Sequence, residues 1–316
     1  MTVKEPICWS PQSLWGVPKR LPDICRWVFG PLPETEWPEV VAMILNGSDG
    51  YFSGQRLSQF PRLRTISSYG IGYDHIDEAY ARQHQIIVTH TPDAVTISTA
   101  EMAVALLLSL VREIVAYHNQ ASRAGKVLTG SGTGLSWELY GKSVGIVGYG
   151  RIGQRLAGLL EPFGVSVHYT RAHGPHPDDP ERWRPLAELL GAADIVIVAV
   201  PLTPQTQHML DRDAIASMKP GSLLVNIGRG PVIDENALVA ALDARHLRGA
   251  ALDVFEDEPR IHQGLLNRPN VILSPHRGTS TYETRVRMTE AAVENICLAL
   301  DGHPIRVIPD VRMSGL

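Results

Sequence analysis

The feature that most constrains the fold of this chain is a glycine-rich loop near its middle. Gly148, Gly150 and Gly153 form the pattern G-x-G-x-x-G directly after the apolar run 143–147. Between a strand and a helix, these glycines permit a tight turn, close approach of the backbone to a pyrophosphate, and close helix packing. The N-terminus of the helix also offers unpaired N–H groups to an anion. Glycine loops without a ligand are common. Here, however, a predicted strand precedes the loop and a predicted helix follows it, and this arrangement favours dinucleotide binding.

The length and composition of the chain indicate an ordinary globular protein with room for two domains. It has 316 residues and a formal net charge of −4, which does not indicate a nucleic-acid partner. The first residues have no apolar segment typical of a signal peptide, and the longest apolar stretch, residues 103–111, is too short to span a bilayer. The sequence therefore predicts a cytoplasmic protein that binds neither nucleic acid nor membrane.

The cysteines give a further expectation about the compartment. Cys8, Cys25 and Cys297 are odd in number and widely spaced, and their spacing does not match that of metal ligands. We interpret them as buried structural thiols in a reducing compartment. No metal site is predicted.

Short apolar runs predict the strands. In the first hundred residues they are 24–29, 41–45, 63–67 and 86–88. In the central block they are 143–147, 165–169, 195–200, 223–227, 249–254 and 271–273. Apolar runs of this length, with helical spacing in most of the segments between them, are typical of buried parallel strands.

Two long helical patterns, residues 98–118 and 282–300, lie outside this alternation and predict the crossovers between two domains. We assign residues 1–100 plus 289–316 to a substrate-binding domain and 101–288 to a dinucleotide-binding domain. The predicted fold is α/β with two doubly wound parallel-sheet domains, a Rossmann-type nucleotide domain inserted in a flavodoxin-like substrate domain. The substrate is expected in a cleft between them. A single large α/β domain is the alternative.

The end of the strand after the glycine loop indicates which dinucleotide binds. An NAD enzyme usually places a carboxylate there, which hydrogen-bonds the 2′-hydroxyl of the adenosine ribose. Here Thr170 and Arg171 occupy this region, and both can bond a 2′-phosphate. The sequence thus favours NADP(H), with weaker support from His173 and His176. NAD(H) binding with a solvated Arg171 is the alternative.

Three segments that follow predicted central strands carry a cation, a carboxylate and an imidazole. They contain Arg229, the acidic turn 253–259 and His276. Ligands of a doubly wound sheet bind beyond the carboxyl ends of its strands, so these groups are expected at one edge of one sheet. A single histidine there is more often a core or surface residue, but the combination predicts a catalytic site.

The same segments carry a resemblance that covers nearly the whole chain. Residues 226–234, 252–259 and 274–276 resemble signature segments of the D-isomer-specific 2-hydroxyacid dehydrogenases, as do residues 70–77 and 91–93. Within that family, residues 169–171 and 227–230 resemble the NADPH-dependent glyoxylate, hydroxypyruvate and hydroxyphenylpyruvate reductases.

The resemblance implies catalytic and substrate-binding roles. Arg229 is expected to hold the carboxylate and carbonyl oxygens of a 2-keto acid, and the backbone amides near Ile71 and Gly72 to bind the carboxylate from the other domain. His276 is expected to donate a proton to the carbonyl oxygen as hydride arrives at carbon 2. Glu258 is expected to hydrogen-bond the imidazole and favour its protonated form.

The resemblance also implies the cofactor contacts. Asp253 is expected to orient the nicotinamide carboxamide, and Pro201 to line the cofactor pocket. The other predicted cofactor-binding residues are Gly148, Gly150, Arg151, Ile152, Gly153, Thr170, Arg171, Ile227, His276 and Gly278. Glu258 is chosen because it lies five residues after Asp253, and its neighbours Glu256 and Asp257 are interpreted as a solvated acidic turn.

The predicted function is NADPH-dependent reduction of a small 2-keto acid, of the glyoxylate or hydroxypyruvate type, to the D-2-hydroxy acid. The apolar helix expected over residues 100–114 packs on the second domain or, as the family favours, forms a homodimer interface. His75, Val127 and Arg277 depart from the family pattern and are expected to affect substrate size or polarity.

Other functions remain open from the sequence. They are an NAD-preferring D-2-hydroxyacid dehydrogenase and a non-catalytic, dinucleotide-sensing interaction protein, since corepressors with this fold exist in the family. A formate dehydrogenase is less favoured because it would carry glutamine in place of Glu258. A phosphoglycerate dehydrogenase is less favoured because many of those enzymes carry an added regulatory domain.

Overall fold

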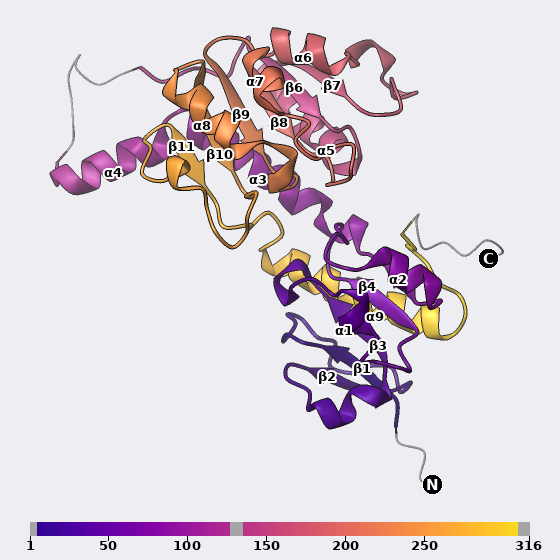
Figure 1. Ribbon diagram of the computed structural model, residues 1–316. Coiled ribbons are helices and arrows are strands. Elements are labelled where there is room, and N and C mark those ends of the chain that lie inside the picture. Colours follow the sequence, from indigo (N-terminus) through magenta and orange to yellow (C-terminus); the bar gives the residue numbers. More distant parts are fainter. Residues whose placement is uncertain (1–4, 127–134, 309–316) are drawn as a thin grey trace. The chain divides into compact units, whose positions relative to one another are not determined.

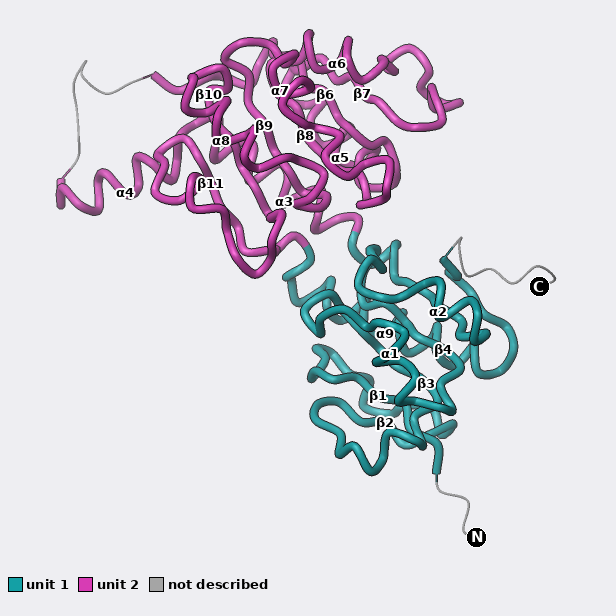
Figure 2. The backbone as a smooth tube through the Cα atoms, in the orientation of Figure 1, with its two compact units in different colours: residues 1–95, 279–316 teal, residues 96–278 magenta. Residues whose placement is uncertain are grey.

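The computed structural model describes residues 5–126 and 135–308 (Figure 1). The chain divides into two compact units, which Figure 2 shows in different colours. Unit 1 consists of Met1–Val95 and Thr279–Leu316, and unit 2 of Thr96–Gly278. Because the second unit interrupts the first in the sequence, the chain has the inserted arrangement that its α/β pattern predicted.

Unit 1 is built on a five-stranded parallel sheet. Its strands are β1 (Ile7–Ser10), β2 (Arg26–Phe29), β3 (Val40–Leu45), β4 (Thr65–Ser68) and β5 (Ile87–Thr89). They lie in the order β2-β1-β3-β4-β5, and every pairing is parallel. This is the flavodoxin-like order, and it confirms the predicted fold of the substrate domain.

The sheet of unit 1 is buried on both faces, because successive side chains of a strand point to opposite sides. Along β3, Met43 and Leu45 belong to one apolar cluster, whereas Ala42 and Ile44 belong to another. The helices of unit 1 are η1 (Glu34–Glu39), η2 (Gly47–Asp49), α1 (Gly54–Leu57), α2 (Glu78–Gln83) and α9 (Tyr282–Leu300).

Helix α9 explains where the unit boundary falls. The Tyr69 hydroxyl donates to the carbonyl oxygen of Arg285 at 2.9 Å and lies 2.9 Å from the Thr289 hydroxyl. Met288 is buried in the same apolar cluster as Tyr69. These contacts place residues on both sides of the predicted bound at residue 288 in unit 1, so the boundary precedes the helix and the predicted bound falls inside it.

The cysteines differ from the expectation. Cys8 and Cys25 form a disulfide, and Cys297 is free and partly buried. The reason is the pairing of β1 with β2, which places Cys8 opposite Trp27 and so brings Cys25 close. The prediction of three thiols is therefore wrong for this pair. The cytoplasmic location, which rested partly on reduced cysteines, stays a prediction.

Unit 2 is built on a six-stranded parallel sheet in the order β11-β10-β9-β8-β6-β7. The strands are β6 (Ser143–Val147), β7 (Ser166–Thr170), β8 (Ile195–Val198), β9 (Ser222–Asn226), β10 (Leu247–Leu252) and β11 (Val271–Leu273). A single parallel bridge between Tyr169 and Trp183 adds the remnant of a strand beyond β7. With that remnant, the order becomes 3-2-1-4-5-6-7, which is the Rossmann 3-2-1-4-5-6 arrangement extended by β11, and the predicted nucleotide-domain fold is confirmed.

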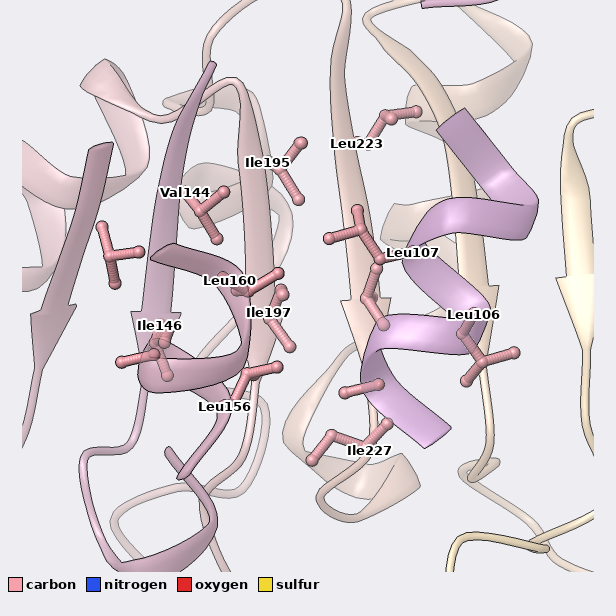
Figure 3. Close-up of a cluster of buried hydrophobic side chains, with 14 of the residues drawn as sticks. Leu106, Leu107, Val144, Ile146, Leu156, Leu160, Ile195, Ile197, Leu223 and Ile227 are labelled. Carbon is pink, nitrogen blue, oxygen red and sulfur yellow. The ribbon is translucent and has the colours of Figure 1, made fainter. Parts of the chain in front are cut away.

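Unit 2 has helices on both faces of this sheet and one further helix that extends away from it. They are α3 (Pro92–Val111), which begins in unit 1, α4 (Ile114–Ala124), α5 (Arg151–Leu160), α6 (Leu186–Ala192), α7 (Arg212–Ala216) and α8 (Glu235–Asp243). Shorter 3-10 helices are η3 (Glu161–Phe163), η4 (Pro180–Arg182), η5 (Gly230–Val232) and η6 (Gln263–Leu265). Figure 3 shows α3 and α5 side chains packed on one face, among them Leu107, Leu156 and Leu160.

Helix α3 corrects one prediction about length. It has 20 residues, and an 18-residue window within it has a mean hydropathy of 1.9, so by length and composition alone it could cross a membrane. The apolar stretch predicted from the sequence, residues 103–111, is shorter than the helix. Polar residues such as Ser98 and Glu101 interrupt the apolar run, but they do not interrupt the helix. More than half of the apolar window is buried (56%), and Ala103 and Leu107 lie in the core of unit 2.

The single helix predicted over residues 98–118 is in fact two helices. Glu113 adopts a left-handed conformation, with φ of 52°, between α3 and α4. This conformation is uncommon for a residue with a side chain, and it ends one helix before the next begins. Figure 1 shows α4 extending away from the sheet of its own unit.

Candidate active site

The glycine loop lies at the switch point of unit 2, where the strand order reverses between β6 and β8. Gly148 has φ of +106°, and a Cβ there would lie 2.7 Å from the carbonyl oxygen of Ala199. A Cβ at Gly153 would lie 2.1 Å from the carbonyl oxygen of Gly148, so only glycine allows α5 to pack this closely. At Gly150 nothing lies within 4 Å of the Cβ position. The loop is therefore tight at its two ends and open in the middle.

This open middle fits the pyrophosphate of a dinucleotide. Gly150 is the N-cap of α5, and no side chain caps the helix there. The N-terminus of α5 is the positive end of the helix dipole and therefore favours an anion at this point. The residues present fit the cofactor that the sequence predicted.

The end of β7 carries the cation that the sequence predicts to meet the adenosine ribose. The amide of Gly148 donates to the carbonyl oxygen of Thr170 at 2.9 Å, which ties the loop to the end of β7. Thr170 is buried and Arg171 follows it directly. Arg171 therefore directly follows the residue that is bonded to the glycine loop, and within the described ranges no hydrogen bond or ion pair occupies its guanidinium.

The Arg229 loop is shaped by Asn226, the last residue of β9. The buried Asn226 amide donates to the carbonyl oxygen of Arg229 at 3.0 Å and accepts from the N–H of Gly228 at 3.0 Å. A Cβ at Gly230 would lie 1.8 Å from the carbonyl carbon of Phe255. Gly230 thus lets the Arg229 loop rest directly on the 253–259 turn, which carries Glu258.

Glu258 and His276 form a hydrogen-bonded pair. Glu258 Oε2 lies 2.9 Å from His276 Nδ1, and Glu258 Oε1 accepts from the N–H of Phe255 at 3.0 Å. Burial alone would raise the pKa of Glu258. The pKa is nevertheless below its ordinary value, because the carboxylate is stabilised by the hydrogen bond and charge of His276, by the Phe255 amide and by the charge of Arg229. The carboxylate therefore stays ionised near neutral pH.

The pair leaves one imidazole nitrogen for other chemistry. Nδ1 faces the carboxylate, and among the described residues His276 Nε2 has no hydrogen-bond partner. The His276 side chain is 47% exposed, so this nitrogen can meet a ligand from solvent. A histidine whose ring is oriented by a carboxylate is suited to transferring a proton at its other nitrogen.

Asp253 holds the loop that carries His276. Its buried carboxylate accepts from the Ser274 hydroxyl at 2.6 Å and from the N–H groups of Arg277 and Gly278 at 2.7 and 2.8 Å. The Asp253 carbonyl oxygen accepts from the N–H of His276 at 2.8 Å. These bonds support the positive φ of His276, 52°, a conformation that an unsupported loop would rarely keep.

The comparisons with known proteins identify the family. The model of the D-isomer specific 2-hydroxyacid dehydrogenase NAD-binding domain matches residues 104–278, which is more than half of the chain. The chain belongs to this dehydrogenase family. It is therefore an NAD(P)-dependent oxidoreductase acting on the CH–OH group of 2-hydroxy acids, as the sequence predicted.

Named relatives cover most of the chain. It is 41% identical over 247 residues to a glyoxylate reductase of Pyrococcus furiosus, covering 75% of this chain and 72% of that protein. It is 39% identical over 266 residues to glyoxylate/hydroxypyruvate reductase A of Arabidopsis thaliana, covering 84% of each. The structure of an NADPH-dependent glyoxylate/hydroxypyruvate reductase from Sinorhizobium meliloti, in complex with NADP and malonate, matches at a TM-score of 0.87 and 31% identity, covering 99% of this chain and 100% of that one.

One interpretation of the acidic turn is wrong for this dehydrogenase. Glu256 is not simply solvated, because its carboxylate lies 2.6 Å from His208 Nε2 and accepts from the N–H of Glu235 at 3.1 Å. The Glu256 amide in turn donates to the Glu235 carboxylate at 2.9 Å. The turn folds back onto the start of α8, which the local sequence does not reveal. Asp257 is exposed and pairs with Arg260, consistent with the solvated interpretation.

The remaining predicted cofactor residues in the dehydrogenase have clear positions in unit 2. Arg151 and Ile152 form the first turn of α5, and Ile152 packs against the core. Pro201 is exposed shortly after β8, and Ile227 is buried directly after β9. A Cβ at Gly278 would lie 2.9 Å from the Asp253 carboxylate, so glycine allows the loop to close onto that side chain.

The predicted substrate residues of the dehydrogenase lie in unit 1, after the carboxyl end of β4. The carbonyl oxygens of Ile71 and Gly72 contact His90 Nδ1 at 3.0 Å and the Ser68 hydroxyl at 2.6 Å. Within the part of the chain that the structure describes, the N–H groups of Ile71 and Gly72 have no hydrogen-bond partner. Two adjacent unpaired amides are suited to binding an anion.

The three positions that depart from the family pattern have different surroundings. Arg277 is exposed beside His276, and His75 is buried in unit 1. Val127 lies outside the described residues. Among the residues that are described, no group of three or more histidine, cysteine, aspartate or glutamate side chains could hold a metal ion.

Proposed function

We propose that this dehydrogenase reduces a small 2-keto acid, of the glyoxylate or hydroxypyruvate type, to the D-2-hydroxy acid with NADPH. The observation that carries the proposal is the hydrogen bond between Glu258 and His276, held beside the Arg229 loop at the sheet edge that also bears the glycine loop. The names of the relatives from Pyrococcus furiosus and Arabidopsis thaliana support the substrate class.

The chain's own residues divide the chemistry between them. Arg229 binds the carboxylate and carbonyl oxygens of the keto acid, and the amides of Ile71 and Gly72 bind its carboxylate. A bound nicotinamide dinucleotide supplies the hydride that is added to carbon 2. His276 donates a proton to the carbonyl oxygen, and Glu258 keeps the ring in the orientation that this donation needs. Asp253, which holds the His276 loop, would also orient the nicotinamide carboxamide of a bound cofactor.

The decisive experiment is a substrate and cofactor panel. The full chain is mixed with glyoxylate, hydroxypyruvate or hydroxyphenylpyruvate and with NADPH or NADH, and the loss of nicotinamide absorbance is followed. We expect turnover with at least one 2-keto acid and a higher kcat/KM with NADPH. Absence of turnover with every acid and both cofactors would exclude the reductase. Cofactor binding without turnover would instead indicate the dinucleotide-sensing alternative.

Arg171 gives a direct prediction for cofactor choice. Replacing it in Arg171→Asp removes a phosphate ligand and adds a carboxylate that repels the 2′-phosphate but can bond a ribose hydroxyl. We expect the ratio of kcat/KM for NADPH to that for NADH to fall by roughly 10- to 100-fold. The comparison uses steady-state kinetics with one keto acid. An unchanged ratio would show that Arg171 does not contribute to the choice between NADPH and NADH.

We also propose that the dehydrogenase is a cytoplasmic homodimer that uses the α3–α4 region. Helix α4 buries none of its residues in its own unit, and Ile114 and Val115 are 52% and 41% exposed. Apolar side chains on a helix that extends from the fold favour association with another chain, and most such oligomers are symmetric dimers.

A further inference from the structure

Two stacked tyrosines beside the glycine loop have no part in the chemistry described so far. Tyr149 is the second residue of that loop, and Tyr169 is the residue before the end of β7. Their rings stack with centroids 3.6 Å apart and planes 10° apart, and only 6% and 0% of the two residues are exposed. Burying two phenolic hydroxyls requires hydrogen-bond partners, and both find them in the segment that follows β7.

The hydroxyls converge on His176 and Asp179. The Tyr149 hydroxyl donates to the Asp179 carboxylate at 2.6 Å, and the Tyr169 hydroxyl donates to the Asp179 carbonyl oxygen at 2.6 Å. The Tyr169 hydroxyl also accepts from the N–H of His176 at 2.7 Å. Burial, followed by the bond to Asp179, raises the pKa of Tyr149, so its hydroxyl remains a donor at any working pH.

Arg182 completes this network, which we call the tyrosine clamp: Tyr149, Tyr169, Asp179 and Arg182. Arg182 Nε donates to the same Asp179 oxygen at 2.7 Å, and another guanidinium nitrogen donates to Glu161 at 2.7 Å. Asp179 is therefore a carboxylate whose charge is balanced by Arg182. Without that balance, it would place a negative charge in the segment that begins with Arg171 and would oppose a phosphate there.

The clamp limits how far Arg171 can move. The segment leaves β7 at Thr170 and returns to it at Trp183, where the N–H of Arg184 donates to the carbonyl oxygen of Tyr169 at 2.9 Å. The Tyr169 hydroxyl holds its middle at His176, and the Tyr149 hydroxyl holds Asp179, three residues further on. Only residues 171–175 lie between Thr170 and the anchor at His176. A short span fixed at both ends has few conformations to lose when Arg171 binds an anion.

We propose that Tyr149 is a positioning residue for cofactor choice. Through the tyrosine clamp it preorganises residues 171–175, so that Arg171 meets the 2′-phosphate of NADP(H) without a further cost of ordering the loop. NAD(H) has no 2′-phosphate and gains nothing from that order. The inference rests on the NADPH preference in the proposed function, and it assigns part of that preference to a hydroxyl that does not contact the cofactor.

The test removes single hydroxyls and measures binding directly. Tyr149→Phe deletes the bond to Asp179 and keeps the stacked ring. Dissociation constants for NADP+ and NAD+ are measured by titration calorimetry on the full chain, without substrate. We expect the Kd for NADP+ to rise about 3- to 10-fold, as for loss of one buried hydrogen bond, and the Kd for NAD+ to change less than about 2-fold.

A matched control and a rescue separate positioning from general damage. Tyr140→Phe removes the hydroxyl of a tyrosine in the same unit that is 78% exposed, and it should change neither Kd. Asp179→Asn keeps an acceptor for Tyr149, whereas Asp179→Ala does not, so Asn should retain more NADP+ affinity than Ala. This pair also tests the clamp if Tyr149→Phe does not fold.

Each outcome bears on the inference. Equal losses for NADP+ and NAD+ in Tyr149→Phe would show a general effect on the glycine loop and would overturn it, as would no loss for either. If the wild-type protein binds NAD+ as tightly as NADP+, the proposed NADPH preference is overturned, and so is the inference about the clamp. Failure of the NADPH preference is seen in the wild type alone, whereas failure of the clamp inference is seen only in the variants, so the two failures are distinguishable.

Discussion

The pair of His276 and Glu258 shows how single residues acquire a function from their neighbours. Glu258 accepts from the Phe255 amide with one oxygen and faces His276 with the other, while Asp253 holds the histidine loop from behind. Each side chain therefore has one orientation that satisfies its hydrogen bonds. Such preorganisation is what allows a general acid to act without first being ordered by the substrate.

The first prediction at this scale concerns the general acid. His276→Ala removes the proton donor while leaving the glycine loop and Arg171 intact. We expect kcat to fall roughly 10²- to 10⁴-fold, the range for loss of general acid catalysis. The Kd of NADPH, measured by fluorescence titration, should stay within about 2-fold. Retained turnover would show that another group protonates the oxygen.

The second prediction concerns the pH dependence that Glu258 introduces. Its pKa is lower in the folded protein than its ordinary value of about 4.3, so the ionised form stabilises the fold. That contribution is present above the unfolded pKa and is lost as the pH falls through the folded pKa. Glu258→Gln should therefore be less stable than wild type at pH 7, with a difference that shrinks in acid.

Thermal unfolding midpoints at about pH 7, 5 and 3.5 test this sign, because the linkage predicts convergence of the two proteins at the lowest pH. We expect a small difference, since the Glu258 side chain is 36% exposed and water screens its interactions. A gap that widens on acidification would contradict the argument.

At the scale of elements, helix α5 is the part that must be placed most closely. Its third residue, Gly153, touches the turn of the glycine loop, and its Leu156 and Leu160 pack on the sheet (Figure 3). The position of the helix thus decides whether its N-terminal N–H groups face the open site at Gly150. Packing on one side of the helix and anion binding at its end are consequences of the same contact.

Two alanine variants of α5 separate these effects. In Gly153→Ala the new Cβ would lie 2.1 Å from the Gly148 carbonyl oxygen, so the helix must shift. We expect a loss of about 1–3 kcal/mol in the free energy of unfolding, together with weaker cofactor binding. Gly158→Ala in the same helix has nothing within 4 Å and should stabilise by up to about 1 kcal/mol.

Chemical denaturation and NADPH titration of both variants measure these changes. If Gly153→Ala matched Gly158→Ala in stability and affinity, the close approach of α5 to the glycine loop would contribute neither to the free energy of unfolding nor to NADPH binding. A loss of stability with normal affinity would mean that the helix end does not contribute to the cofactor site.

At the scale of the whole molecule, the two units are separate sheets with different strand orders, each with its own buried clusters. The Rossmann unit carries the proposed catalytic residues and the cofactor loop, whereas the flavodoxin-like unit carries Ile71 and Gly72. The proposed chemistry therefore draws on residues of both units. It also leaves α4, which buries none of its residues in its own unit, for a role in assembly.

The prediction at this scale concerns the oligomeric state. Light scattering on the purified chain should give the mass of a dimer, about twice 34.6 kDa. The double variant Ile114→Glu with Val115→Glu places two charges on α4 and should shift the mass toward the monomer. Tyr51→Glu alters an exposed aromatic residue of unit 1 and should not. A dimer that survives the double variant would place the interface elsewhere.

Much of the fold was predictable because its signals are local. Buried parallel strands are short apolar runs, and all ten predicted runs overlap strands of the two sheets. The glycine pattern follows β6 directly, and the segments bearing Arg229, Glu258 and His276 follow β9, β10 and β11. Strand β1, Ile7–Ser10, was not predicted.

The sequence alone thus determined the fold class, the family resemblance and the edge of the sheet at which the chemistry is expected, since these depend on residues close together in the chain. Only the tertiary structure decided the Cys8–Cys25 disulfide, the contact of Glu256 with His208 and the tyrosine clamp. Each of these joins segments brought together by folding, and the free energy of such a contact depends on a geometry that local sequence does not contain.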